Sequence, residues 1–459
     1  MGYRMSSFVD EYRRDGIVAL RNALNRRTEY LSENSYDRLK DLHSAPESHP
    51  RFTSLVEKRI LVPAEENDEE TYRRNVGVYS LHTNIVTMYI MMTLRCNYDC
   101  RYCLIEGNLS PAQATMGLDP KTAEKGIDLF LENATGTSKL TFVLHGGEPL
   151  LDKGLLYHVV DYVEEAVRRR THIRAGYSIA INTNGSLIDD AFLDRIAKNP
   201  NVTLVVSVDG RKDVHDAMRV FPNGAGTYDT TVRSVRKAVD RGIGVGVSLT
   251  VGRHNVSDLT SHVMSLVQDL KVRVFAFNFL RDLEHQNNPA NHDIGEVFDA
   301  AIAAAKALKE KHGAYEDKIY IRRWPVFTDT SLASFHVSDC DGVGCQIVLT
   351  PTGKIGPCSA YVGSEKYFVP MDSITGPLGD HPIWQKWLEC SPVRRRGCLE
   401  KRCPDVDFCG GGCPYNAEVR TGDLQAADSD ACLLSKKLKE FYVWEKYESL
   451  VAGAQASAP

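Results

Sequence analysis

Residues 84–103 read NIVTMYIMMTLRCNYDCRYC, an apolar run that ends at three closely spaced cysteines. A near-continuous apolar run of this length predicts a strand buried on both faces, as in a parallel sheet covered by helices. The cysteines then lie in the loop that follows the strand. Because function in parallel α/β folds is found beyond the carboxyl ends of the strands, this loop is the first candidate for a functional site.

Five further apolar runs follow, separated by amphipathic helical patterns such as PKTAEKGIDLFLENA and YDTTVRSVRKAVDRG. They span residues 139–147, 177–185, 202–210, 245–251 and 272–280. Right-handed crossovers curl such an array toward a barrel. We therefore expect an α/β fold built on a partial (β/α)6 barrel. HGGEP, NTNG and SVDG end the second, third and fourth runs, although any one of these motifs is equally typical of a simple turn.

The composition excludes some classes of partner. Charged residues make up 25% of the 459 residues and the formal net charge is -5, which gives no electrostatic reason to expect nucleic acid. The N-terminal residues MGYRMSSFVDEYRRDG lack the apolar core of a signal peptide, and no uninterrupted apolar run is long enough to span a membrane. We expect a cytoplasmic protein with no membrane partner.

Twelve cysteines in such a chain need an explanation, because a reducing compartment disfavours structural disulfides. Three of them lie between residues 96 and 103, none lies between 104 and 339, and nine lie between 340 and 432. This distribution indicates two separate cysteine-based regions that bind metal or carry out redox chemistry.

The first region is a C-x3-C-x2-C run. Three thiolates from one short loop leave one iron of a four-iron cluster without a protein ligand, and that iron can bind a small molecule. A structural zinc site made of three cysteines and a distant histidine is the alternative. The position of the loop at the mouth of a parallel barrel favours chemistry.

These motifs resemble the radical S-adenosylmethionine (radical SAM) superfamily over about residues 84 to 280. The residues that carry the resemblance are Cys96, Cys100, Cys103, Tyr102, Gly146, Gly147, Glu148 and Pro149. The resemblance implies that the cysteines bind a [4Fe-4S] cluster whose open iron chelates S-adenosylmethionine. One electron from the reduced cluster then cleaves the cofactor and yields methionine and a 5'-deoxyadenosyl radical.

The resemblance also implies contacts to the cofactor. Its ammonium needs acceptors, which the GGEP loop supplies through carbonyls and Glu148, with glycine allowing a close backbone approach. Ser207 and Arg219 resemble the pair that binds the carboxylate in this family. Asn184 is a candidate for the nucleoside, and Asp209 is either a ribose acceptor or the first residue of an Asp-Gly turn.

The second cysteine region resembles the SPASM domain over about residues 336 to 440, on the fragments PTGKIGPC and CPDVDFCGGGC. The family arrangement implies two auxiliary [4Fe-4S] clusters, and hence three clusters in all. Their implied ligands are Cys340, Cys345, Cys358 and Cys413 for one, and Cys398, Cys403, Cys409 and Cys432 for the other. Cys390 is left over. The gap from Cys398 to Cys403 is wider than usual, so Cys390 is an alternative ligand to Cys398; a zinc ribbon is the alternative for the whole domain.

SPASM enzymes include sulfatase maturases and maturases of ribosomally made peptides. Ser359 stands where the sulfatase maturases carry an Asp, which disfavours that activity. We expect a peptide maturase that installs a thioether or carbon-carbon crosslink in a ribosomal precursor peptide, with a flavodoxin- or ferredoxin-type electron donor. A formylglycine-forming, sulfatase-type maturase, a dehydrogenase of small molecules and a zinc-binding scaffold protein are the alternatives. No catalytic base is identified; His145 and Glu106 lie near the expected active-site mouth.

The expected domain organisation has four parts. Residues 1–83 form an N-terminal segment that resembles the region before the barrel in many peptide maturases, where it recognises a precursor or simply caps the barrel. Residues 84–295 form the partial barrel and residues 296–335 a linking helix region. Residues 336–459 form the auxiliary-cluster domain.

Overall fold

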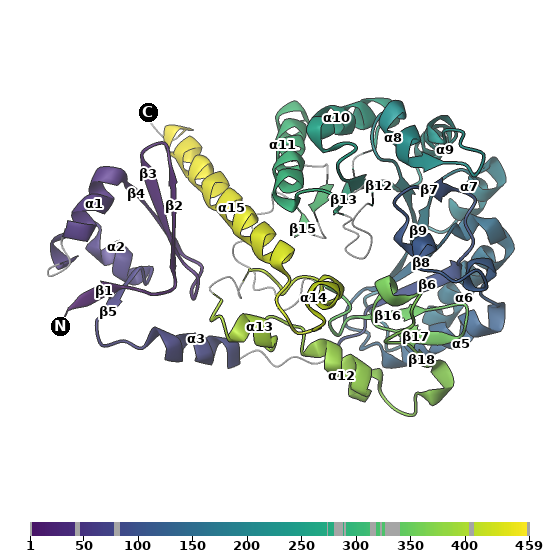
Figure 1. Ribbon diagram of the computed structural model, residues 1–459, viewed down its shortest axis with the longest axis horizontal. Helices are drawn as coiled ribbons and strands as arrows, with labels where there is room; N and C mark the ends of the chain where they lie inside the picture. Colours follow the sequence, from purple (N-terminus) through teal and green to yellow (C-terminus); the bar gives the residue numbers. More distant parts are fainter. Residues whose placement is uncertain are drawn as a thin grey trace. The chain divides into compact units, whose positions relative to one another are not determined.

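The computed structural model divides into two compact units (Figure 1). The barrel unit comprises residues 82–326 and 341–389, and the terminal unit comprises residues 1–81, 327–340 and 390–459. The described residues are 2–41, 46–77, 83–272, 274–279, 288, 291–312, 318–321, 324–325, 340–403 and 408–456. Among them, none of the helices combines the length and the apolar character that crossing a membrane requires.

The six strands expected from the sequence form the centre of the barrel unit. They are β6 (Thr87–Thr93), β8 (Leu140–Gly146), β9 (Tyr177–Thr183), β10 (Val202–Ser207), β12 (Val245–Val251) and β13 (Val274–Phe279). Each pairs in parallel with its neighbour in this order. The partial (β/α)6 barrel is therefore confirmed.

In the described part of the chain, the sheet continues beyond these six strands to a total of eleven. On one side lie β14 (Lys318–Ile321), parallel to β13, and β15 (Trp324–Pro325). On the other side β16 (Gln346–Leu349) pairs in parallel with β6 and is followed by the antiparallel β17 (Lys354–Gly356) and β18 (Val369–Pro370). Residues expected in the auxiliary-cluster domain thus contribute three strands to this sheet, a long-range pairing that local sequence patterns do not reveal.

Helices cover the outer face of the sheet (Figure 1). The main ones are α5 (Pro120–Asn133), α6 (Lys153–Arg168), α7 (Asp190–Ile196), α9 (Tyr228–Asp240), α10 (Leu259–Leu270) and α11 (Ile294–His312). Asp119, Asp152 and Asp189 cap three of them by accepting a backbone N–H of the first turn. The helix expected to link two domains is α11, and it packs against α10 as the crossover between the parallel strands β13 and β14.

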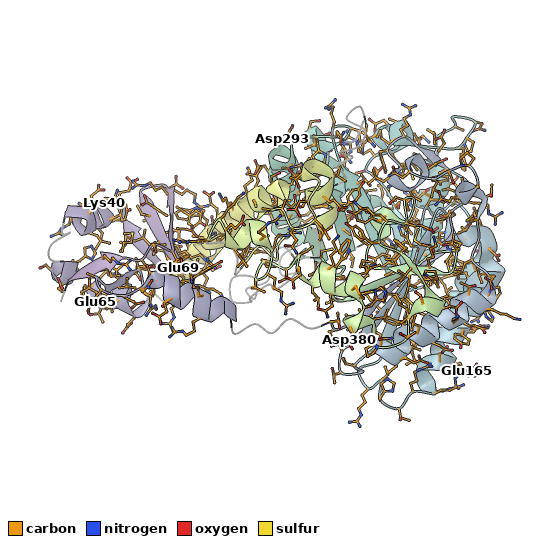
Figure 2. All side chains as sticks on the ribbon, turned by 60° about the horizontal axis from the view of Figure 1, so that its bottom comes forward. Lys40, Glu65, Glu69, Glu165, Asp293 and Asp380 are labelled. Atoms are coloured by element: carbon orange, nitrogen blue, oxygen red, sulfur yellow. The ribbon has the colours of Figure 1, made fainter. Side chains whose placement is uncertain are left out.

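The inner face of the six strands is polar but uncharged. None of the six strands contains Asp, Glu, Lys or Arg. Because side chains alternate between faces, the face opposite the helix-packed Phe142 carries His145, Asn182, Ser207, Ser248 and Asn278. The exposed Glu165 on α6, by contrast, lies on the outer helical surface (Figure 2).

The terminal unit contains a three-stranded antiparallel sheet between helices. Its strands are β2 (Val9–Arg14), β3 (Ile17–Asn22) and β4 (Thr28–Ser32). Val18, Leu20 and Leu31 pack on one face against α1 (Glu33–Asp41) and α2 (Phe52–Glu57). On the other face lies the long helix α15 (Ser429–Ala456), whose Val443 carbonyl accepts a 2.6 Å hydrogen bond from Tyr30 (Figure 1).

The remaining elements of the terminal unit are short. A two-stranded sheet joins β1 (Tyr3–Met5) to β5 (Leu61–Pro63), and α3 (Asp68–Gly77) follows it. The cysteine-rich part carries α13 (Arg396–Leu399) and α14 (Pro414–Thr421). Most of the C-terminal cysteines therefore lie in loops or at helix ends.

Candidate active site

The candidate site is built from loops that follow consecutive parallel strands of the barrel unit. The cysteine loop follows β6, and its short strand β7 (Asp99–Cys100) pairs with β11 (Arg219–Val220), which lies beyond β10. The loops after β8, β9, β10 and β12 carry HGGEP, NTNG, SVDG and GRHN. Since carboxyl ends of parallel strands share one edge of a sheet, all of these loops meet at that edge.

The two glycines of HGGEP pack directly against the chain that leads into Cys96. The backbone N–H groups of Gly147 and Glu148 donate to the carbonyls of Thr93 and Arg95, each at 2.8 Å. A Cβ on Gly146, whose φ is +145°, would collide with the Thr93 carbonyl, and one on Gly147 would collide with that of Arg95. Positions 146 and 147 therefore require glycine because their backbone lies directly against residues 93–95.

Glu148 connects two of the loops. Its fully buried carboxylate accepts hydrogen bonds from Thr183 Oγ1 at 2.7 Å, Asn184 N at 2.8 Å and Leu150 N at 3.0 Å. Burial raises its pKa to about 7, against the opposing effect of these donors. Pro149 begins the short helix η3 (Pro149–Asp152) that follows. Glu148 thus holds the GGEP loop against the loop after β9.

A closed ring of three polar side chains lies beside the first cysteine. Asn97 Nδ2 donates to Ser186 Oγ at 2.9 Å, Ser186 Oγ donates to Asn184 Oδ1 at 2.7 Å, and Asn184 Nδ2 donates to Asn97 Oδ1 at 2.9 Å. Asn184 Nδ2 also lies 4.0 Å from Cys96 Sγ. The sequence-predicted Asn184 is therefore brought to the cysteine loop.

Tyr102, which directly precedes Cys103, forms a buried network with Asp209 and Arg219. Asp209 accepts two bonds from Arg219, at 2.8 and 3.1 Å, and one from the Tyr102 hydroxyl. The Arg219 guanidinium also lies 5.2 Å from the centroid of the Tyr102 ring. Burial alone would raise the pKa of Asp209, but Arg219 holds it below its usual value, so this carboxylate is an anion.

The contacts of Asp209, Arg219 and Ser207 limit how Ser207 and Arg219 can bind a carboxylate, the role predicted for this pair. Asp209 forms a buried ion pair with Arg219, and Gly210 follows it at φ +136°. Arg219 donates to Asp209 through Nε and Nη2, and its Nη2 also lies 3.4 Å from Thr250 Oγ1. Ser207 ends β10, and its hydroxyl makes no hydrogen bond to any residue that the structure describes.

Sequence reasoning missed several residues that position the cysteine loop. Asn97 and Tyr98 lie between the first two cysteines, and the Tyr98 hydroxyl hydrogen-bonds Thr231 Oγ1 at 3.0 Å. Ser186 and Thr231 complete the contacts to the loop after β9, because Thr231 Oγ1 donates to the Asn184 carbonyl at 3.0 Å. The position of Asn97, Tyr98 and Ser186 between or beside the motifs was the available signal, whereas Thr231 on α9 has no such signal.

The cysteine thiols of this loop need the positive charge of a bound metal centre to become thiolates, and an iron-sulfur cluster supplies that charge. Burial raises the pKa of the Cys100 thiol to about 12 and also raises that of Cys103, so both sulfurs hold protons at neutral pH without a metal. Among the described residues, no three Cys, His, Asp or Glu side chains are arranged to hold a single metal ion. In a four-iron cluster, by contrast, each thiolate binds a different iron.

Four of the C-terminal cysteines gather in the terminal unit. The Cys403 N–H donates to the Cys398 carbonyl at 3.2 Å, and Cys409 Sγ lies 4.0 Å from the carbonyl of Ala431, next to Cys432. Burial raises the pKa of the Cys398 thiol, and the neighbouring Cys432 adds to this effect. Cys390 is fully buried in the same unit, and its thiol donates to the Leu424 carbonyl at 3.5 Å.

The hairpin of β16 and β17 places two further cysteines together. Cys345 precedes β16 and Cys358 follows β17, and the pairing of Val348 with Gly356 brings both to the open end of the hairpin. The Gln346 side chain crosses between the strands and donates to the Pro357 carbonyl at 2.8 Å. Their two expected co-ligands, Cys340 and Cys413, belong to the terminal unit.

Comparisons with known proteins agree with this geometry. Residues 90–266 match the Radical SAM superfamily. The radical SAM cyclopropyl synthase TigE of Paramaledivibacter caminithermalis is 21% identical over 402 residues, covering 84% of this chain and 80% of the relative. The structure of anSMEcpe with bound AdoMet and the Cp18Cys peptide has a TM-score of 0.64 at 18% identity, covering 81% of this chain and 99% of that one. Streptococcus suis SuiB bound to precursor peptide SuiA has a TM-score of 0.58 at 13% identity, covering 94% and 99%. At these identities the structural likeness shows a shared fold.

Proposed function

Because residues 90–266 match the Radical SAM superfamily, we propose that this chain is a peptide maturase that abstracts hydrogen from a ribosomal precursor and installs a thioether or carbon-carbon crosslink. One observation carries the proposal. The loop of Cys96, Cys100 and Cys103 is held by hydrogen bonds to the loops after β8, β9 and β10 at the carboxyl edge of the barrel sheet.

Each part of the site has a proposed role. The three cysteines bind a [4Fe-4S] cluster, which together with S-adenosylmethionine supplies the 5'-deoxyadenosyl radical. The GGEP loop accepts from the ammonium of the cofactor. Ser207 and the remaining N–H groups of Arg219 bind its carboxylate, because the Ser207 hydroxyl has no protein partner in the described part of the chain. Asp209 and Tyr102 position Arg219 and the cysteine loop.

The terminal cysteines are proposed to hold two auxiliary [4Fe-4S] clusters. Crosslink formation leaves a substrate radical one electron richer than the product, so a nearby acceptor is chemically useful. The gathering of Cys398, Cys403, Cys409 and Cys432 supports one of these clusters. A flavodoxin- or ferredoxin-type protein is the proposed electron donor.

The inner face of the barrel supports a peptide as the substrate. Its hydrogen-bonding groups, among them Asn182, Ser248 and Asn278, are uncharged, which suits the amide groups of a polypeptide. A small molecule rich in carboxylates would require cations there, and the six strands contain none. TigE, anSMEcpe with its peptide and SuiB with SuiA are consistent with this choice.

The test begins with the anaerobically reconstituted full chain. We expect about four irons at Cys96, Cys100 and Cys103, and release of 5'-deoxyadenosine when dithionite and S-adenosylmethionine are added. The matched control replaces these three cysteines with Ser and should release none. Bound zinc without cleavage of the cofactor would refute the enzyme and support a scaffold protein.

The second step uses a short peptide encoded beside the gene as the substrate. A crosslink lowers the peptide mass by two hydrogen atoms and leaves no aldehyde for a hydrazide to capture. A sulfatase-type activity would instead convert a Cys or Ser to an aldehyde that a hydrazide captures, and would overturn the crosslinking proposal.

The N-terminal sheet is the proposed site of precursor recognition. In the described residues, β2 and β4 each have an edge with no further strand, which a peptide can extend. We expect deletion of residues 1–75 to weaken binding of the precursor far more than binding of S-adenosylmethionine, as measured by titration. Equal loss of both would show that the segment only stabilises the protein, since α15 also packs on this sheet.

A further inference from the structure

The side-chain amide of Asn184 is directed at a cysteine sulfur. Asn184 is 8% exposed, and its Nδ2 lies 4.0 Å from Cys96 Sγ. Two backbone N–H groups also face sulfurs of this loop, from Tyr98 to Cys96 and from Glu106 to Cys103, each at 3.4 Å. Among the described residues, Asn184 is therefore the side chain that donates to the sulfur of a cysteine in this loop.

The orientation of the Asn184 side-chain amide is set by a neighbouring group that can only donate a hydrogen bond. The backbone N–H of Ser186 can only donate, and it bonds Asn184 Oδ1 at 2.9 Å. The oxygen of the amide is therefore on the Ser186 side and the nitrogen on the side of Asn97 and Cys96. One N–H of Asn184 bonds Asn97 at 2.9 Å, which leaves the other for the sulfur.

The amide is also rigidly held. The Asn184 backbone N–H donates to Glu148 Oε2 at 2.8 Å, and its carbonyl accepts from Thr231 Oγ1 at 3.0 Å. With the side-chain ring of Asn97 and Ser186, the residue is fixed on three sides. An N–H dipole held in this way interacts with the charge on the sulfur without reorganising.

We propose that Asn184 tunes the reduction potential of the cluster bound by Cys96, Cys100 and Cys103, as a positioning residue that donates to the Cys96 sulfur. Reduction adds negative charge to the cluster and its sulfurs, so a fixed N–H donor stabilises the reduced state more and raises the potential. The inference rests on the cluster ligands of the proposed function. It differs from the expectation that Asn184 contacts the nucleoside.

The test is a potentiometric titration of the full-length, reconstituted protein without S-adenosylmethionine, followed by electron paramagnetic resonance. The signal that is absent from the triple Cys96→Ser, Cys100→Ser, Cys103→Ser variant belongs to this cluster. We expect Asn184→Ala to reduce the ratio of reduced to oxidised cluster at a given potential about tenfold, which is a midpoint about 59 mV more negative for one electron.

Two further variants keep the test decisive if Asn184→Ala binds iron poorly. Ser186→Ala keeps the amide but removes two bonds of the ring, and should shift the midpoint in the same direction by less. Asn199→Ala is the matched control, because Asn199 bonds Glu164 and a neighbouring backbone N–H at the opposite edge of the sheet. It should leave the midpoint unchanged.

An unchanged midpoint in both Asn184→Ala and Ser186→Ala, with native iron content, would overturn the inference. Weaker binding of S-adenosylmethionine with an unchanged midpoint would likewise overturn it and assign Asn184 to the cofactor. Absence of any four-iron cluster at these cysteines in the native protein would refute the proposed function itself, which is a separate and distinguishable failure.

Discussion

At the scale of single residues, Asp209 is a centre of hydrogen bonding in the candidate site. It accepts hydrogen bonds from Arg219, the Tyr102 hydroxyl and the Thr250 backbone, and its own carbonyl accepts from Asn255. It thereby joins the cysteine loop to the ends of β10 and β12. A carboxylate with no exposed surface is tolerated there because a guanidinium neutralises it.

We expect Asp209→Asn to destabilise the protein by about 3–5 kcal/mol, because Arg219 would remain as a buried cation without its partner. The measurement is the urea denaturation midpoint at neutral pH. Asp190→Asn is the control, since the exposed Asp190 carboxylate pairs with Lys237 and Arg241 and such pairs contribute little. An equally small change in both variants would contradict the prediction.

His215 predicts a pH dependence. Burial lowers its pKa to about 4, and its ring nitrogens face Asp209 N at 3.3 Å and Thr227 Oγ1 at 3.0 Å. The unfolded chain, with a histidine pKa of about 6.5, binds more protons below that pH. The stability that neutral His215 contributes is therefore complete above about pH 6.5 and is lost as the pH falls toward about 4.

We expect His215→Gln to be less stable than the native protein at neutral pH but to lose less stability between about pH 6.5 and 4. Denaturation midpoints at several pH values measure this. His172→Gln, at an exposed position, should follow the native profile. Parallel profiles for the native protein and His215→Gln would show that other groups cause the acid sensitivity.

At the scale of elements, the GGEP loop sets the position of the cysteine loop. Two backbone hydrogen bonds and two glycines hold the GGEP loop against residues 93–95, which directly precede Cys96. The loop therefore acts on the cysteines through the backbone, whatever further contact it makes with a cofactor.

We expect Gly147→Ala to fold but to bind little iron at this site, because its Cβ would push the Arg95 carbonyl and with it Cys96. Iron content after reconstitution measures the effect, with about four irons expected for the native site. Gly107→Ala is the control, since a Cβ there meets no atom within 4 Å. Native iron content in Gly147→Ala would contradict this role of the loop.

At the scale of the whole molecule, the cysteines separate into groups with different surroundings. Cys398 accepts a backbone hydrogen bond from Cys403 and has Cys432 as a neighbour, whereas the Cys390 thiol donates to the Leu424 carbonyl. This difference supports Cys398 rather than Cys390 as a cluster ligand.

We expect the native protein to hold about twelve irons, Cys398→Ser about eight, and Cys390→Ala about twelve. Iron and sulfide analysis of the reconstituted proteins measures these contents. Loss of four irons in Cys390→Ala but not in Cys398→Ser would reverse the assignment, and about four irons in the native protein would refute the auxiliary clusters.

Much of the fold and of the site followed from local patterns. Each of the six barrel strands was visible as an apolar run, and the motifs after them mark one edge because parallel strands end on the same side. Spacing alone identified Cys96, Cys100 and Cys103 as a group. These features depend on neighbours in the chain, so the sequence by itself determined them.

The tertiary structure decided what depends on residues far apart in the chain. The pairing of β16 with β6, the packing of α15 on the N-terminal sheet and the use of α11 as a crossover all join segments with no local signature. The same holds for the commitment of Arg219 to Asp209 and for the amide of Asn184 beside Cys96. A side chain's partner is set by packing and burial, and these exist only once the chain has folded.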